Sequence, residues 1–206
     1  EQEGFSSRSS DLDRKATDLG LSNKDWSRPF VGSELEEYKD YLSQQQKYYQ
    51  RSKDLDVVGK ELFAPPKVWS RPFEETDLSS RKKELDDLRV LISDVKGLVS
   101  KAHSIGWKTS LPSPPYTLSQ KKDLESQILE QEKLLSDLKE KEESVGLPFS
   151  IPYPPFPLSS EQVSQYEEKL LEQKSIHEEL SGLSKEFGVS LPNGPYPSDV
   201  VSSFRG

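Results

Sequence analysis

The sequence predicts an all-α protein made of tandem repeats of about 40 residues, each with one long amphipathic helix and an extended linker rich in proline and aromatic residues. Two observations lead to this fold class. A Ser-x-Pro phrase recurs along the chain at a nearly constant interval. Between these phrases the apolar residues follow the three- and four-residue steps of a helix. We expect the repeats to form either an elongated array or a coiled coil or bundle.

The composition fits long helices with narrow apolar faces. Hydrophobic residues make up 32% of the chain and charged residues 31%, and the mean hydropathy is −0.79. A large globular core needs more apolar side chains, whereas a disordered chain usually carries fewer leucines and aromatics. Acidic and basic residues are interspersed, which is typical of solvated helix surfaces.

The recurring phrase sets the register of the repeats. "WSRPF" occurs at Trp26–Phe30 and again at Trp69–Phe73. The prolines of the Ser-x-Pro phrases are spaced by 43, 40, 40 and 40 residues: Pro29, Pro72, Pro112, Pro152 and Pro192. The last three linkers add a second proline and an aromatic: Pro115–Tyr116, Pro155–Phe156 and Pro195–Tyr196. Prolines that only terminate helices would not share a register, so we interpret the pattern as a true repeat.

This register divides the chain into six segments. Residues 1–25 are expected to be a partly ordered N-terminal segment that resembles the end of an earlier unit. The repeats themselves are residues 26–68, 69–109, 110–149 and 150–189. Residues 190–206 are then the start of a truncated repeat or a cap.

Each repeat is expected to contain one helix, at about 33–60, 77–103, 118–145 and 159–187, with a weaker helix at Ser10–Leu19. An apolar stripe at helical spacing defines the last three. Its residues are Leu85, Leu88, Ile92, Val95 and Val99, then Leu124, Ile128, Leu135 and Leu138, then Val163, Tyr166, Leu170 and Leu180. A helix with one narrow apolar face is only marginally stable alone in water, so each stripe must pack against something.

Residues with the right chemistry stand near both ends of the predicted helices. Ser79, Ser119 and Ser159 can each accept a hydrogen bond from the first turn and act as an N-cap. Glycines lie near the predicted C-termini, where a left-handed conformation is often needed: Gly59, Gly106, Gly146 and Gly188.

The linkers are long enough to run back along a helix. Proline-rich segments favour the polyproline II conformation, and a linker of 12 to 14 residues then spans roughly 40 Å. A helix of about 26 residues spans a similar length. Three arrangements follow: an antiparallel bundle, parallel helices with returning linkers, or helices placed end to end. Linkers of this length exceed what a bundle needs, which disfavours a minimal bundle.

The linkers also hold most of the large aromatic residues. A solvated spacer would instead be rich in glycine, serine or charge. These aromatics either cover helix ends within the array or insert into pockets of a partner protein. The candidates for partner binding are Trp26, Phe30, Trp69, Phe73, Trp107, Tyr116, Phe149, Tyr153, Phe156 and Tyr196.

Nothing in the sequence predicts a catalytic, cofactor or metal site. The net charge is −8 without a basic cluster, so we expect no nucleic-acid partner. There is no cysteine, and His103 and His177 do not have metal-ligand spacing. No apolar run reaches the length of a transmembrane helix. The chain does not begin with methionine, which suggests a processed organellar or secreted product or a fragment of a longer protein, and the compartment stays open.

Two hypotheses for function follow. In the first, the chain is a non-enzymatic structural scaffold or linker whose repeated helices and aromatic linkers bind a larger assembly or filament at regular intervals, through self-association or a repeating partner subunit. In the second, it is a self-contained helical-bundle module that binds a single protein or small ligand. Each copy of a repeated unit could bind weakly in the first case, whereas the second case needs one good groove.

Overall fold

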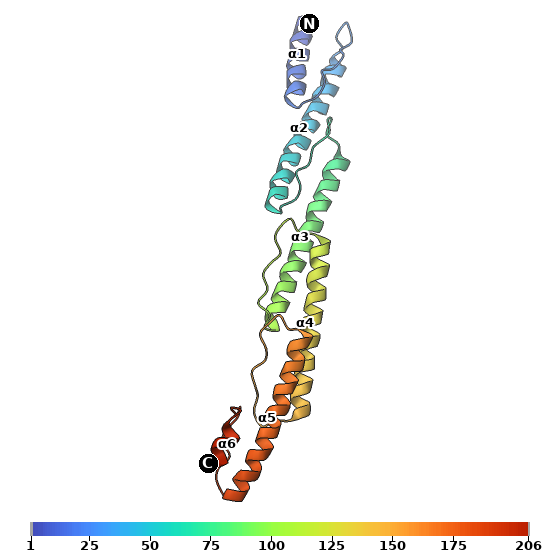
Figure 1. Ribbon diagram of the computed structural model, residues 1–206. Helices are drawn as coiled ribbons and strands as arrows, with labels where there is room; N and C mark the ends of the chain where they lie inside the picture. Colours follow the sequence, from blue (N-terminus) through green and yellow to red (C-terminus); the bar gives the residue numbers. More distant parts are fainter. Residues whose placement is uncertain (1, 206) are drawn as a thin grey trace. The chain divides into compact units, whose positions relative to one another are not determined.

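The computed structural model describes residues 2–205, and these residues form six α-helices without any β-strand (Figure 1). Extended segments connect the helices. The helices are α1 Gln2–Asp18, α2 Gly32–Glu61, α3 Glu75–Ser104, α4 Leu118–Val145, α5 Ser160–Phe187 and α6 Val200–Arg205.

The predicted helices are confirmed, with ends that differ by at most two residues for α2, α3, α4 and α5. The N-terminal helix is longer than the predicted Ser10–Leu19. Its first half is rich in serine and has no apolar stripe, so the sequence pattern could not reveal it. The hydroxyl of Ser9 donates to the carbonyl of Ser6, which lets this polar side chain be buried in the helix.

The chain divides into two compact units. The first comprises Glu1–Asp94 with Pro112–Leu118, and the second comprises Val95–Leu111 with Ser119–Gly206. Each unit is described by itself below.

In the first unit, α2 and α3 run parallel and overlap along part of their length. Arg51 of α2 forms a two-bond ion pair with Glu75 at the start of α3, at 2.5 and 2.9 Å. Two turns further along both helices, Arg81 lies against Gly59, so closely that a Cβ there would meet Nη2 at 3.0 Å. Residue numbers therefore rise together along the two helices. Figure 1 shows the connecting segment running back beside α2.

The α1–α2 pair of the same unit is built in the same way. Leu12, Ala16 and Leu19 of the first helix and its end pack in one apolar cluster with Leu35 and Leu42 of α2. A Cβ at Gly32 would meet the ring of Phe5 at 3.8 Å, so the first turns of both helices also lie together. The apolar stripe of each helix is thus covered within the chain.

In the second unit, α4 and α5 are also parallel, and their linker lies in the core between them. Ile151 and Leu158 of the linker pack in one cluster with Leu138 of α4 and with Tyr166 and Leu170 of α5. An ion pair also joins the two helices, between Lys141 of α4 and Glu167 of α5. Within each unit, the returning linker is therefore the arrangement found among the three that the sequence allowed.

The helix ends agree only in part with the sequence analysis. Ser159 is an N-cap as predicted, and Gln162 completes its capping box. Ser79 and Ser119 are not caps, because they lie inside α3 and α4. Each of these helices begins earlier, close behind the proline–aromatic pair of its linker. A serine in the first turns is therefore a weak marker of the helix start.

Three of the four predicted C-terminal glycines have a left-handed backbone: Gly106, Gly146 and Gly188 have φ values of 97°, 65° and 67°. The prediction for Gly59 is wrong, because this residue is buried inside α2. The left-handed position at the end of α2 is taken by Phe63, with φ of 57°.

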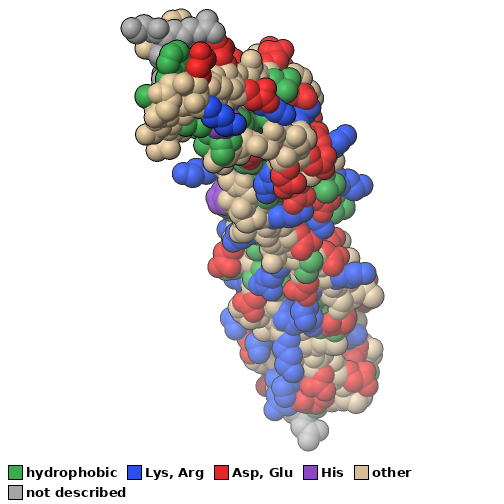
Figure 2. Space-filling view, turned by 90° about the horizontal axis from the view of Figure 1, so that it is seen from below, with side chains coloured by type: hydrophobic (Ala, Val, Ile, Leu, Met, Phe, Trp, Pro, Cys, Tyr) green, Lys and Arg blue, Asp and Glu red, His purple; other side chains and the backbone are tan. Residues whose placement is uncertain are grey.

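The described surface is strongly polar. Figure 2 shows acidic and basic side chains interspersed over the face in view, with hydrophobic side chains scattered among them. None of the helices within residues 2–205 has a stretch that is both long and apolar enough to cross a lipid bilayer.

Candidate binding site

Glutamine side chains hold the linkers to the helices. At Gln45 of α2, Nε2 donates to the carbonyl of Phe73 at 3.0 Å, and Oε1 accepts from the N–H of Phe73 at 2.8 Å. Gln45 and Phe73 are both buried. One amide thus satisfies both main-chain groups of a residue that has left regular secondary structure, which removes the cost of burying them unpaired. We call this pair of hydrogen bonds an amide clasp.

The described residues contain four such clasps. The other three join Gln2 to Phe30 at 3.4 and 3.1 Å, Gln131 to Leu158 at 3.0 and 2.5 Å, and Gln173 to Tyr196 at 2.8 and 2.7 Å. Each clasped residue follows a proline with a cis peptide bond: Pro29, Pro72, Pro157 and Pro195. The sequence analysis gave Phe156 the same position in its linker as Tyr116 and Tyr196. The clasped residue of this fourth linker is instead Leu158.

The "WSRPF" phrases use their other residues in the same way in both places. The indole Nε1 of Trp26 donates to the carboxylate of Asp13 at 3.0 Å, and that of Trp69 donates to Asp56 at 3.0 Å. The guanidinium of Arg71 stacks on the ring of Phe73, with its carbon 3.7 Å from the ring centre. Every large side chain of the phrase therefore has an internal contact.

Arg71 also caps a neighbouring helix. Its Nε donates to the carbonyl of Leu19 at the end of α1, at 3.0 Å. A cation is favourable there because the last carbonyls of a helix carry partial negative charge. The side chain of Arg71 passes over Gly20, where a Cβ would lie 3.5 Å from Nε.

The structure places most of the aromatic candidates at least partly inside the chain. Phe30, Phe73 and Tyr196 are buried, whereas Tyr153 is 39% exposed and donates from its hydroxyl to Glu142. The half-buried candidates are Trp26, Trp69, Trp107, Tyr116, Phe149 and Phe156.

The helix stripes are covered to different degrees. The buried members are Leu85, Val95, Val99, Leu124, Ile128, Leu138, Val163, Tyr166, Leu170 and Leu180. Leu88, Ile92 and Leu135 are only half-buried. Leu88 and Ile92 follow each other on one face of α3, so the third helix is where the stripe is least completely covered.

Burial also affects the tyrosines whose hydroxyls bond to the main chain. The hydroxyl of Tyr166 donates to the carbonyl of Ile151, and desolvation, followed by the nearby Glu142 carboxylate, raises the pKa of Tyr166 to about 12. Desolvation likewise raises the pKa of Tyr196, whose hydroxyl donates to the carbonyl of Pro192. Both side chains are therefore neutral donors near neutral pH.

The amide clasp is missing at one place in the first unit. Leu88 precedes Tyr116 by 28 residues, the same separation as between Gln45 and Phe73, and Tyr116 follows the cis-proline Pro115. A leucine cannot provide the two hydrogen bonds of an amide. Pro114 also occupies the position that Arg71 has in the preceding linker, so no arginine caps the end of α2 from this linker.

Phe63 is the third departure at the same place. Gly20 stands at the corresponding end of α1 with φ of 71°, whereas α2 ends on a phenylalanine in the same left-handed region. This conformation costs a non-glycine residue about 1–2 kcal/mol. The main chain still makes the helix-ending bond from Ala64 N–H to the carbonyl of Gly59, at 2.8 Å. The ring of Phe63 is 57% exposed, so its own burial does not offset the cost.

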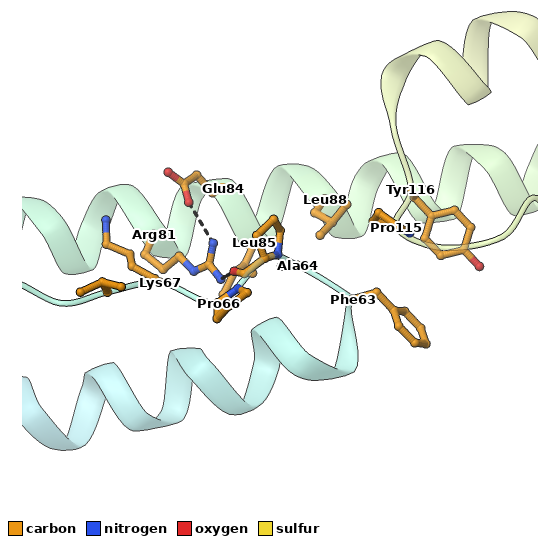
Figure 3. A pocket seen from close by; sticks show the side chains of 12 residues that line it. Phe63, Ala64, Pro66, Lys67, Arg81, Glu84, Leu85, Leu88, Pro115 and Tyr116 are labelled. Atoms are coloured by element: carbon orange, nitrogen blue, oxygen red, sulfur yellow. Dashed lines mark hydrogen bonds and ion pairs between the residues drawn. The ribbon is translucent and has the colours of Figure 1, made fainter.

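Phe63 and Leu88 line a groove of about 580 Å³ on α3, which we call the α3 groove (Figure 3). One end is formed by the segment after α2, from Phe63 to Val68, and the other by Pro115 and Tyr116. The floor is formed by Arg81, Glu84, Leu85 and Leu88 of α3. In Figure 3 the ring of Phe63 points away from the helices into open space.

A buried guanidinium lies in this groove. Arg81 donates from Nη2 to the carbonyl of Pro65 at 2.7 Å and pairs through Nη1 with Glu84 at 3.2 Å (Figure 3). Its side chain is only 8% exposed. Its Nε is buried without a hydrogen-bond partner among the described residues. Such a donor is costly to leave unpaired, and because this nitrogen is buried, the cost falls on the folded chain itself.

The α3 groove has an exposed apolar wall. No group of three or more metal-ligating side chains occurs within residues 2–205. His103 and His177 lie outside the groove and bond to the carbonyl of Thr109 and the hydroxyl of Tyr196. Phe63 and Val68 are 57% and 93% exposed, and such exposed apolar side chains are typical of contact surfaces.

The sequence analysis missed the glutamines and aspartates that bind the linkers. A signal was present, because Gln2, Gln45 and Gln131 stand at multiples of 43 residues. Asp13 and Asp56 each precede a tryptophan by 13 residues. Polar residues on a charged helix look solvated in the sequence, and the first prolines of the linkers follow a different spacing from these glutamines.

Compared with protein-family models, with curated proteins and with solved structures, the chain matches none. The function proposed below therefore rests on the residues and their geometry.

Proposed function

We propose that the chain is a non-enzymatic structural scaffold, built as a tandem array of units of about 40 residues, which binds a larger assembly or filament at regular intervals. Each unit consists of one amphipathic helix and the proline/aromatic linker that it holds. The partner is a protein, either further copies of the chain or a repeating subunit. The proposal involves no cofactor.

The recurrent amide clasp is the observation that carries this proposal. The same two hydrogen bonds, on a residue after a cis-proline, join helix and linker at Gln2, Gln45, Gln131 and Gln173. Because the clasp recurs, each helix with its linker presents a similar surface. Similar surfaces along one chain suit a partner that is itself periodic. Many weak unit contacts then add up to a stable attachment.

The linkers and the exposed apolar residues of the helices supply the contact surfaces in this proposal. Leu129 of α4 and Leu171 of α5 are 62% and 53% exposed. Trp69 and Trp107 are half-buried, so part of each ring is available to a partner. Such half-buried aromatics often provide much of the energy of an interface.

The α3 groove favours a second candidate function, a self-contained module that binds one ligand. The groove lies where the clasp is missing, and such a departure singles out one place on the chain. Its exposed apolar wall and its buried Arg81 would then define a single site. A scaffold with one specialised unit would show the same feature.

Small-angle X-ray scattering of the purified chain separates the two candidates. A compact domain of this length has a radius of gyration of about 17 Å. A value near this figure would contradict the array and favour the single-site module. A clearly larger value, together with hydrogen-exchange protection that varies from one helix to the next, is the result expected for an array.

A further inference from the structure

A second groove, between α1 and α2, has an apolar floor and a basic rim. Its volume is about 430 Å³. Leu12, Leu19 and Leu42 form the floor and are each less than 9% exposed. Lys15, Lys39 and Lys47 stand at its rim with only one lining carboxylate, Asp18. We call this surface the basic groove.

The basic groove is unusual in a chain whose net charge is −8. Lys39 pairs with the exposed Glu36 at 3.0 Å. Lys15 and Lys47 are both exposed, and neither has an ion pair within residues 2–205. Two cations therefore remain available on opposite helices, one on each side of the apolar floor.

The α4–α5 pair in the second unit has the opposite charge at the corresponding surface. A groove of about 410 Å³ there is lined by Asp137, Glu140 and Glu167, with Lys141 as its one cation. Lys141 is already paired with Glu167. Packing that is otherwise alike thus carries a basic surface in one unit and an acidic surface in the other.

An exposed ridge on α5 joins this acidic surface to an apolar side chain. Leu171 is 53% exposed, and Glu168 and Glu172 stand beside it, separated by one helical turn. Neither glutamate has an ion pair within the described residues. Lys174, one turn further along, is half-buried. We call Glu168, Leu171 and Glu172 the acidic ridge.

We propose that the basic groove binds the acidic ridge of a second copy of this chain. Leu171 of one copy packs onto Leu12, Leu19 and Leu42 of the other. Glu168 and Glu172 pair with Lys15 and Lys47 at the rim. We choose a second copy as the partner because the two surfaces have complementary charge. The chain itself provides both the cationic groove and an anionic ridge with an apolar centre.

This contact joins two different surfaces, so the association is head to tail. Such an interface leaves a free groove on one copy and a free ridge on the other, and it therefore continues beyond two copies unless the geometry closes a ring. Self-association rests on the proposed scaffold function, for which it names a partner. It does not depend on the tandem repetition of the units. A chain that stays monomeric would overturn self-association and leave binding to a different protein untouched.

Analytical ultracentrifugation of the full chain at rising concentration tests the proposal. We expect oligomers that grow with concentration and dissociate as the salt concentration rises, since exposed ion pairs are screened. A monomer at every concentration would overturn it, and so would an association that salt leaves unchanged.

Charge reversals identify the surfaces. The groove variant Lys15→Glu with Lys47→Glu and the ridge variant Glu168→Lys with Glu172→Lys should each weaken self-association by about tenfold or more. The control variant Lys122→Glu with Lys139→Glu makes the same change in net charge on the exposed side of α4 and should associate as the parent chain does. A groove variant that associates like the parent would contradict the proposal.

A mixture of the two variants tests whether a loss of association comes from misfolding. The groove variant keeps an intact ridge and the ridge variant an intact groove, and the reversed groove of the first also complements the reversed ridge of the second, so an equal mixture should form oligomers in which the two variants alternate. The chain that carries all four reversals should regain self-association, because its charges are exchanged rather than removed. Failure of both the mixture and the exchanged chain would overturn the assignment of these surfaces.

Discussion

The end of α1 and the end of α2 are two versions of one junction, and they differ in how firmly the next linker is held. At the first, Gly20 provides the left-handed turn, Arg71 caps the helix end, and Gln45 clasps Phe73. At the second, these three positions hold Phe63, Pro114 and Leu88. A groove lies beside both junctions, of about 420 Å³ at the first, where Gly20 and Arg71 line it, and of about 580 Å³ at the second, where Phe63 and Leu88 line it. The difference shows how three residues change the lining of a groove from polar contacts that hold the linker to an exposed apolar ring.

The largest expected effect concerns the two rings at these junctions. Phe73→Ala should destabilise the chain by about 3–5 kcal/mol, because a ring that is 3% exposed leaves a cavity. Phe63→Ala should change the free energy of unfolding by less than about 0.5 kcal/mol, since that ring is 57% exposed. Urea denaturation followed by circular dichroism measures both. Equal losses for the two variants would contradict the distinction between the junctions.

Removing the clasp at the first junction should have the next largest effect. Gln45→Leu leaves the buried N–H and carbonyl of Phe73 without partners, at a cost of about 3 kcal/mol in total. Gln44→Leu changes an exposed neighbour on the same helix and is the matched control. Hydrogen exchange should become faster around residues 70–75 in the first variant only. If Gln44→Leu accelerated exchange there as strongly, the clasp would not be the cause.

Glycine at the end of α2 should stabilise the second junction. Phe63→Gly removes a left-handed phenylalanine and should raise the free energy of unfolding by about 1 kcal/mol. The reciprocal change, Gly20→Ala at φ of 71°, should lower it by a similar amount. The melting temperature should rise in Phe63→Gly and fall in Gly20→Ala, each compared with the parent chain. A loss of stability in Phe63→Gly would mean that the exposed ring itself stabilises the fold.

The smallest expected effect is the transfer of the clasp to the second junction. Leu88→Gln places an amide at the position from which Gln45 reaches Phe73, so the amide hydrogen of Tyr116 should exchange about fivefold more slowly. Leu88→Met keeps the side chain apolar and is the control. If both variants left the exchange rate of Tyr116 unchanged, the two junctions would differ by more than this residue.

The pattern of helices could be predicted because it depends on local chemistry. Stripes such as Leu124 to Leu138, the glycines at 106, 146 and 188, and the prolines between them each act within a few residues. The capping serines at 79 and 119 were predicted wrongly. Those helices begin close behind Phe73 and Tyr116, and the residues that stand opposite them, Gln45 and Leu88, lie 28 positions earlier in the chain.

The candidate site could be predicted only in part. The sequence pointed to the linker aromatics, and Tyr116 lines the α3 groove. It did not point to Arg81, because the sequence of a charged helix does not distinguish a buried arginine from a solvated one. It also passed over Phe63, since a left-handed phenylalanine becomes visible only in the backbone angles.

The sequence by itself determined which segments are helical, where apolar stripes lie and that the linkers are too aromatic to be free spacers. These properties follow from residue spacing and side-chain chemistry, which act over one or two turns. Only the tertiary structure decided that the linkers run back along their helices, that glutamine amides hold them, and that Leu88 leaves one of them without a clasp. The physical reason is that a buried main-chain group must find a hydrogen-bond partner, and the partner can come from any residue that the fold brings near.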